Sequence, residues 1–587
     1  MWRKNALFLG LCLLGAAAIA TSLWRRDRVA QPESYWPERF VTPTAASASS
    51  TDAQIPVASA DPQQPSANKG PSLLGPPRRP QSDIGQTLAE LNREFREHWE
   101  KRELQVAPPA DHLTIARRMS LALTGTIPSL EEIRALERVS PEHRTEWWTS
   151  HLLEDRRFSD YFAERFARAY VGIEQGPFLV YRRRRFVTWL SDKIAENRPY
   201  DEIVRKLIAE DGLWTGSPAT NFVTATSQQQ MNNEPDEIRL AARVARAFLG
   251  MRIDCLQCHD DKLGNIILGD ADNPRTGAQA DFHHLAAFFS GAKVGLVGVY
   301  DEDTPYQFKF LNAENEVVVP PQVPYLESAL PKSGNRREQL AAWVTSPENK
   351  PFARATVNRV WALMFGRPLV EPIDDIPLMA KYPPGLQLLA DDFVAHGYDL
   401  QRLIRLIAAS DAFQRASLAD FEITPQHEEH WAVFPLARLR PEQVAGSLTQ
   451  AASLTTIDAQ AHIVWRLAKA GEIDEFVRRY GDIGEDEFED RAGTIPQRLL
   501  MMNGSLVKEK TRENLVANAA TRIARQTASD ERAVEAAYLA VLSRRPDEVE
   551  SRHFANRLAG KQGAERIAAM EDLYWVLINS TEFSWNH

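Results

Sequence analysis

The 587-residue sequence contains only three cysteines, which excludes a fold built on many disulfides. Cys12 lies in an N-terminal apolar run, so Cys255 and Cys258 are the two left for the folded region. The sequence also lacks a basic excess, since 69 Lys and Arg face 79 Asp and Glu and the formal net charge is −10. Nucleic-acid binding normally needs a concentrated basic face, so no nucleic-acid partner is expected.

Several catalytic motifs are missing as well. The sequence has no phosphate-binding loop of the Walker type, no G-x-S-x-G nucleophile elbow and no H-E-x-x-H zinc motif. A hydrolase or a nucleotide-dependent enzyme is therefore poorly supported. The sequence as a whole favours a protein that is not an enzyme.

The first 29 residues predict export. Ala6–Trp24 is an uncharged stretch of 19 residues, about 28 Å long as a helix and close to the thickness of the hydrocarbon core of a bilayer. Ala18 and Ala20 form an A-x-A-like cleavage site, so a signal peptide is the alternative to a membrane anchor. We favour an uncleaved anchor that tethers the chain to the inner membrane, with its folded part in the periplasm or cell envelope.

Residues 30–85 predict a disordered linker. The segment is rich in Pro, Ser and Ala, with seven prolines from Pro56 to Pro80, and it has little apolar surface to bury. From there on, apolar residues recur at helical spacing, which predicts a mainly α fold. We expect two helical domains, at 86–292 and 331–587, with a small β-hairpin insert and connector at 293–330, where alternating β-branched and aromatic residues occur.

Local signals place individual helices within this outline. Ser129 followed by Glu132 is the pattern of a capping box at a helix start. A second predicted helix carries Leu240, Val244 and Phe248 on one face and ends at Gly250.

The cysteine motif comes directly after this helix, as Cys255-Leu256-Gln257-Cys258-His259. C-x-x-C-H is the pattern of covalent c-type haem attachment, in which two thiols form thioethers and the histidine binds the iron as proximal ligand. We therefore expect one covalent haem c at Cys255, Cys258 and His259. As the second axial ligand we consider His283 or His284, about 25 residues on, with Met251 or an open position as alternatives.

Two other interpretations of the motif remain open. Cys255 and Cys258 can form a disulfide in a tight loop, or they can bind a metal together with His259 and one further ligand. No second C-x-x-C pair accompanies them, which disfavours a structural zinc site. The arginine run at 181–186 has two interpretations as well: a clamp for haem propionates or an anionic partner, or a solvated helix face paired with acidic neighbours, which we favour.

The ordered motifs resemble a family of planctomycete-type exported proteins that carry two tandem domains of unknown function. The resemblance rests on "IARRMSLALTGTIPSLEEI", "FLGMRIDCLQCHDDK" and "DFHHLAAFF" in the first domain, from about 111 to 291. In the second domain, from about 336 to 587, it rests on "LAAWVTSPENKPFARATVNRVWALMFGRPLVEPIDD" and "LINSTEFSWNH". The resemblance implies a cytochrome-associated C-x-x-C-H domain followed by its usual C-terminal partner domain.

This sequence departs from the family pattern in three places. The family commonly has a second histidine where Asp261 stands, a tyrosine where His283 stands, and a separate cytochrome domain, which the linker replaces here. If that second histidine serves the iron or a metal in relatives, its role is lost here or passes to His283 or His284. In the second domain, the residues that match the family pattern best are Asn358, Arg359, Trp361, Asp374 and Asp375. They predict a buried ion-pair network that fixes helix packing rather than a catalytic site.

The function expected from the sequence is therefore that of an exported c-type haem protein. It would act in electron transfer or as the redox module of a cell-envelope assembly, with redox proteins of the envelope as partners. The alternatives are a scaffolding protein with a disulfide or metal staple at the motif, and a haem peroxidase with an open sixth position.

Overall fold

The computed structural model describes residues 84–173, 180–227, 234–311, 313–457, 476–480, 488, 494–511 and 518–587. These residues belong to one compact unit, Leu74–His587. Helices with small two-stranded sheets make up the fold, so the predicted mainly α class is confirmed.

The helices fall into two runs along the chain, before and after residues 287–335. The first run comprises α2 (Gly85–Lys101), α3 (His112–Thr124), α4 (Leu130–Glu137), α5 (Arg144–Glu154), α6 (Arg156–Val171), α7 (Arg183–Ala195), α8 (Tyr200–Ala209), α9 (Asn221–Thr224), α10 (Glu237–Leu249) and α11 (Gln279–Ala286). The second run comprises α12 (Arg336–Val344), α13 (Lys350–Phe365), α14 (Leu386–Ala395), α15 (Leu400–Ala409), α16 (Asp411–Gln414), α17 (Pro425–Glu429), α18 (Pro441–Ala451), α20 (Ile495–Asn503), α21 (Ser505–Thr511), α22 (Ala519–Gln526), α23 (Asp530–Leu542), α24 (Glu548–Leu558) and α25 (Gly563–Ile578).

The strands form antiparallel pairs. They are β1 (Ile267–Asp270) with β2 (Asn273–Thr276), β3 (Ala292–Gly295) with β4 (Gly298–Asp301), β5 (Gln307–Phe308) with β6 (Val317–Val318), and β7 (Ala437–Arg438) with β8 (Trp585–Asn586). The predicted insert at 293–330 thus contains two short hairpins rather than one. The β1–β2 hairpin and the β7–β8 pair have no counterpart among the predictions.

The predicted helix boundaries follow from a side-chain cap at the start of α4 and a left-handed glycine at the end of α10. The Ser129 side chain accepts a hydrogen bond from the Glu132 backbone N–H, and the Glu132 carboxylate accepts one from the Ser129 backbone N–H. Helix α10 ends at Gly250, whose φ of +62° lies in the left-handed region. The apolar face predicted for α10 is fully buried. These local predictions are confirmed.

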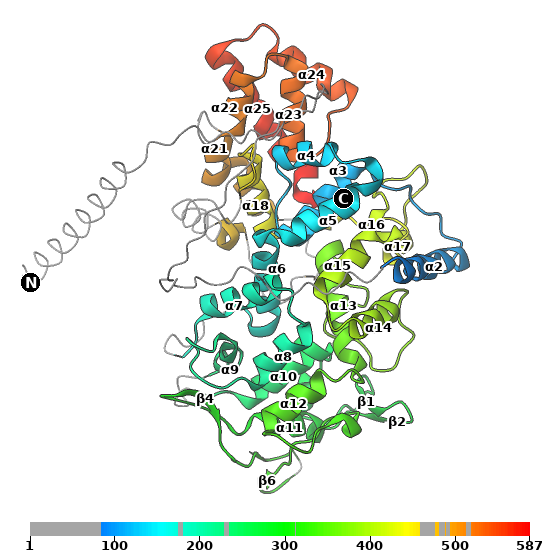
Figure 1. Cartoon of the computed structure of the whole chain (residues 1–587), viewed down its shortest axis with the longest axis vertical. Helices are drawn as coiled ribbons and strands as arrows, with labels where there is room; N and C mark the ends of the chain where they lie inside the picture. The colour runs from blue at the N-terminus through cyan, green and yellow to red at the C-terminus, as the bar shows by residue number, and fades with distance from the viewer. Residues whose placement is uncertain are drawn as a thin grey trace, which may run out of the picture. The chain divides into compact units, whose positions relative to one another are not determined.

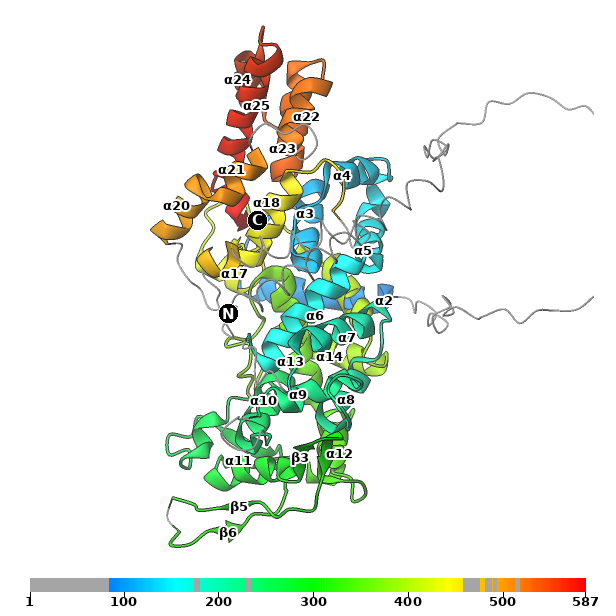
Figure 2. The same cartoon turned by 90° about the vertical axis from the view of Figure 1, so that its left-hand side faces the viewer.

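Two large clusters of buried apolar side chains, with a small third one of Leu113, Ile133 and Leu539, form the core of the described residues. The larger one runs from Leu91 to Phe434 and takes residues from both sides of the predicted boundary near 331. The smaller one gathers residues from Leu439 to Phe583 around Leu121 and Ile127. Figure 1 shows α22 to α25 beside α3 and α4 at one end of this unit, and α11, α12 and strands β1, β2, β4 and β6 at the other. Figure 2 shows the same order after a quarter turn, with α6, α13 and α10 between the two ends.

Arg337 of α12 joins segments that lie far apart in the sequence. Its side chain is fully buried, and its Nε and Nη2 donate to the Asp301 carboxylate at 2.8 Å each. Nη1 donates to the backbone carbonyls of Ile208 and Glu210, and Nη2 also donates to Asp211. One guanidinium therefore holds the end of α8, strand β4 and helix α12 together.

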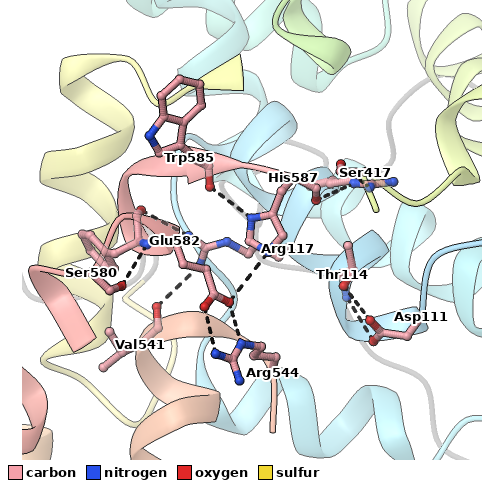
Figure 3. A network of polar contacts seen from close by, with 12 residues as sticks. Asp111, Thr114, Arg117, Ser417, Val541, Arg544, Ser580, Glu582, Trp585 and His587 are labelled. Atoms are coloured by element: carbon pink, nitrogen blue, oxygen red, sulfur yellow. Dashed lines mark hydrogen bonds and ion pairs between the residues drawn. The ribbon is translucent and has the colours of Figure 1, made fainter. Parts of the chain in front are cut away.

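Helix α3 holds the last residues of the chain in the same way. Arg118 Nε donates to the His587 backbone oxygen at 2.7 Å, and Arg117 Nη2 donates to the Phe583 carbonyl at 3.3 Å. Arg544 pairs with Glu582 at 2.6 Å beside them (Figure 3). Because both α3 arginines are almost completely buried, the carbonyl oxygens replace the water they have lost.

Among the described residues no helix is long and apolar enough to cross a membrane. The predicted export segment at 1–29, and the predicted linker at 30–85 apart from its last two residues, lie outside the described part of the chain.

The buried carboxylate of Glu132 predicts an acid-sensitive fold. Burial alone would raise its pKa, but hydrogen bonds from His151, Ser129 and Arg157, with the Arg157 charge, lower it to about 2. A carboxyl pKa below its unfolded value stabilises the fold above the unfolded pKa, and that stability is lost as the pH falls toward the folded pKa. Glu132→Gln should therefore lower the free energy of unfolding by up to about 3 kcal/mol at neutral pH.

Urea unfolding followed by tryptophan fluorescence, from about pH 7 to about pH 3, checks this prediction. The difference between the variant and the natural protein should shrink as the pH falls below about 4.5. Glu131→Gln, at an exposed position of the same helix, is the control and should stay within about 0.5 kcal/mol of the natural protein. A difference that does not depend on pH would contradict the assigned role of the Glu132 charge.

Candidate functional site

The C-x-x-C-H sequence forms a tight turn directly after α10. Residues Asp254–Gln257 make one turn of 3₁₀-helix, in which the Leu256 N–H donates to the Ile253 carbonyl at 3.0 Å. The Cys258 N–H donates to the Cys255 carbonyl at 3.3 Å. These bonds keep the two cysteines on one short turn, and we call residues 252–259 the cysteine loop.

The two sides of the cysteine loop differ in exposure. Leu256 is completely buried in the main core, which anchors the turn. Cys255, Cys258 and His259 are all exposed, and both thiols are free. The three residues predicted to hold haem are therefore accessible from solvent on the same turn.

The hydrogen bond of His259 indicates which of its ring nitrogens is available. Its Nδ1 lies 2.8 Å from the backbone oxygen of Asp260, so the proton belongs on Nδ1, which donates. The lone pair is then on Nε2. Histidine ligands of metals commonly have this arrangement, with one ring N–H given to a backbone carbonyl and the other nitrogen left for the metal.

His283 supports the cysteine loop from behind. It is buried on α11, its Nε2 donates to the Gln257 carbonyl at 3.0 Å, and its Nδ1 accepts from the Tyr306 hydroxyl at 2.9 Å. Its ring stacks on Phe308 with 3.4 Å between ring centroids. Burial lowers the pKa of His283, which keeps the ring neutral and suited to this donor and acceptor pair. Since both nitrogens are engaged, the contacts favour a structural role over that of an iron ligand.

Gln279, also on α11, completes this support. Its Nε2 donates to the same Gln257 carbonyl at 3.0 Å, and its backbone N–H donates to Asp260 Oδ1 at 2.9 Å. The carbonyl in the middle of the C-x-x-C turn thus accepts two hydrogen bonds from one helix. Gln279 is not among the residues predicted from the sequence. The only signal for its role is its position four residues before His283, which places both side chains on the same face of a helix.

Asp261 folds the loop that follows the motif. Its carboxylate accepts hydrogen bonds from the backbone N–H groups of Ile266 at 2.6 Å, Leu263 at 3.0 Å and Gly264 at 3.1 Å. The bond from Ile266 is the main cause that lowers the pKa of this carboxyl. Where the family pattern has a second histidine, this chain therefore has a residue that caps a turn.

The histidines predicted as metal ligands are held by separate contacts. His284 Nδ1 lies 2.7 Å from the Pro320 carbonyl, while His283 faces Gln257 and His259 faces Asp260. In the described part of the chain, no three His, Cys, Asp or Glu side chains are grouped so that they could hold a metal ion. A haem iron needs only axial ligands, so the assignments of His259, His283 and His284 stay predictions.

The electrostatics at Cys255 bear on what its thiol can do. Partial desolvation by neighbouring groups raises the pKa of the Cys255 thiol, and the carboxylates of Asp261 and Asp254 act in the same direction. Thioredoxin-type exchange uses a thiol of lowered pKa, which such surroundings do not provide. The local charges therefore favour a protonated thiol at neutral pH.

The arginine run at 181–186 has contacts that favour the second of its two interpretations. Arg183 pairs with both oxygens of Glu164, at 2.8 and 3.0 Å, and Arg185 donates to the Thr215 carbonyl at 3.2 Å. These arginines bind neighbouring helices and loops of the protein itself.

The comparisons with known families agree with the sequence motifs. A family model described as "PSCyt2: Protein of unknown function (DUF1549)" matches residues 90–293, and one described as "PSD1: Protein of unknown function (DUF1553)" matches residues 336–472. The chain belongs to the planctomycete-type PSCyt2–PSD1 pair. The predicted family resemblance is thereby confirmed. No curated protein and no solved structure matches the chain.

The PSCyt2 domain contains α10, the cysteine loop and α11, so the motif and the helix that supports it lie within this domain. Its name suggests a cytochrome-related protein. The PSD1 domain contains α13 and Asp374, which lie against the start of the cysteine loop.

Two histidines of the PSCyt2 domain should respond differently to substitution. His283→Ala removes two buried hydrogen bonds and a stacked ring, so it should lower the free energy of unfolding by about 2–4 kcal/mol. His259→Ala removes an exposed ring and should change it by less than about 0.5 kcal/mol. Urea denaturation of the full chain without haem measures both variants. Equal effects of the two substitutions would contradict a supporting role for His283.

Proposed function

We propose that this protein is an exported c-type haem protein that acts in electron transfer or as the redox module of a cell-envelope assembly. The observation that carries the proposal is the cysteine loop itself. Two free, exposed thiols and a histidine whose Nε2 keeps its lone pair lie on one turn that is anchored by a buried leucine. The PSCyt2 match, with its cytochrome-related name, supports the same class.

Each residue of the motif would have a defined role. The Cys255 and Cys258 thiols each add across a vinyl group of the porphyrin: a sulfur–carbon bond forms and the thiol hydrogen goes to the neighbouring carbon, so no oxidant is consumed. His259 offers Nε2 as the proximal ligand, and its Nδ1–H bond to the Asp260 carbonyl orients the ring. When bound, haem supplies an iron that takes up and releases one electron.

The surroundings of Cys255 disfavour one of the rival chemistries. The raised pKa of its thiol is the opposite of what a redox-active dithiol needs. Covalent haem attachment takes place outside the cytoplasm, so the proposal includes export by the apolar segment at 1–29 and a location in the periplasm or cell envelope. The partners would be redox proteins of that compartment.

Haem attachment can be tested directly on the full chain. Expressed in a bacterium that matures c-type cytochromes, the protein should carry a haem stain that survives a denaturing gel and an intact mass increased by one haem. The double variant Cys255→Ala/Cys258→Ala has no thiol in the folded region and should lose both signals. Cys12→Ala, the matched control outside the motif, should keep them.

Two results would overturn the proposal. One is a natural protein from such a host that shows no Soret band and no added mass. The other is a chain lighter by the two thiol hydrogens, which identifies a disulfide staple instead.

A further inference from the structure

A loop of the PSD1 domain lies against the point where the cysteine loop begins. This loop connects α13 to α14, and its Ile376 N–H donates to the Gly250 carbonyl at 2.7 Å. A Cβ on Gly250 would come within 3.1 Å of Ile376 Cδ1 and 3.3 Å of Ala355 Cβ. With its positive φ, Gly250 thus meets two requirements at once: it ends α10 and it lets the PSD1 domain approach the backbone.

Asp374 of the same loop binds both flanks of the Gly250 turn. Its Oδ2 accepts from Nε of Arg246 on α10 at 2.7 Å, and its Oδ1 accepts from Nε of Arg252 at 2.6 Å. The Asp374 side chain is 9% exposed, so these charge-assisted bonds are shielded from most of the solvent. Arg252 precedes Cys255 by three residues, which brings the contact to the edge of the motif.

The loop that carries Asp374 is itself held in place by α13. Asn358, which is completely buried, accepts from the Val370 N–H at 2.9 Å and donates to the carbonyls of Val370 at 2.9 Å and Ile373 at 3.3 Å. A continuous series of hydrogen bonds therefore runs from α13 through this loop and Asp374 to both sides of the Gly250 turn.

We propose that Asp374 is a positioning residue for the cysteine loop, and that the PSD1 domain thereby completes the site of the PSCyt2 domain. Its carboxylate fixes Arg246 and Arg252 relative to each other and so sets the direction in which residues 252–259 leave α10. The effect on haem rests on the proposed function above, whereas the effect on the loop does not. The sequence predicts a buried ion-pair network that includes Asp374. In the structure Asp374 pairs with Arg246 and Arg252, so this network connects the two domains and reaches the motif.

The first test uses the full chain without haem, purified from a host that does not mature c-type cytochromes. Asp374→Asn keeps the side-chain volume but removes the charge that balances two guanidinium groups. Backbone hydrogen exchange of peptides covering 251–261 should become at least about tenfold faster, because local opening of the turn costs less. Peptides from α25, in the smaller core cluster, should exchange as before.

Two further variants make this test decisive. Asp391→Asn removes an exposed carboxylate of the same domain, which pairs with Lys350, and should leave the 251–261 peptides unchanged. Arg252→Gln removes one of the two partners of Asp374 at a partly exposed position, so it should accelerate the same peptides in a chain that folds. Unchanged exchange in both Asp374→Asn and Arg252→Gln, or equal acceleration in α25, would overturn the proposal.

The second test uses the loaded protein. Loss of the Asp374 charge next to the motif should raise the midpoint potential, because two positive charges then favour the reduced state, while Asp391→Asn should not change it. The same potential and the same loaded fraction in Asp374→Asn as in the natural protein would contradict a positioning role toward haem. If the natural protein carries no haem, the proposed function fails, and the exchange experiment alone decides the role of Asp374.

Discussion

Buried guanidinium groups need partners for their N–H donors, and this constraint recurs at several places where distant parts of the chain meet. A buried charge without compensation costs several kcal/mol, so an arginine in the interior ties together whatever segments supply its acceptors. Arg337 joins α8, β4 and α12 in this way, and Arg118 joins α3 to His587. At Asp374 the arrangement is inverted, because one buried carboxylate serves two arginines.

These cross-links explain why the cysteine loop is both accessible and defined in position. Its outer side presents Cys255, Cys258 and His259, which make few contacts of their own. Its inner side is held by Leu256 in the core, by two α11 donors on the Gln257 carbonyl and by the PSD1 domain at Gly250. The loop is therefore rigid where the protein supports it and free where a group could be attached.

Local features of this fold could be predicted from the sequence, and long-range ones could not. The capping box at Ser129 and the end of α10 at Gly250 depend on residues within one helical turn, so the pattern alone indicates them. The partners of Arg252 and Arg118 lie 122 or more positions away, and no periodicity connects them. His283 is predicted as a ligand from its residue type and its position about 25 residues after the motif. The contacts that hold its ring come from Tyr306 and Phe308 of the insert, which no spacing rule places beside α11.

The separation between Arg252 and Asp374 also imposes an order of events on biogenesis. A chain that crosses a membrane from its N-terminus delivers the two cysteines well before the α13–α14 loop, because 122 positions separate the two partners. Until that loop arrives, the segment around Gly250 lacks its contacts with Ile376 and Asp374. In such a chain the turn before the motif would reach its final position only when the second domain docks.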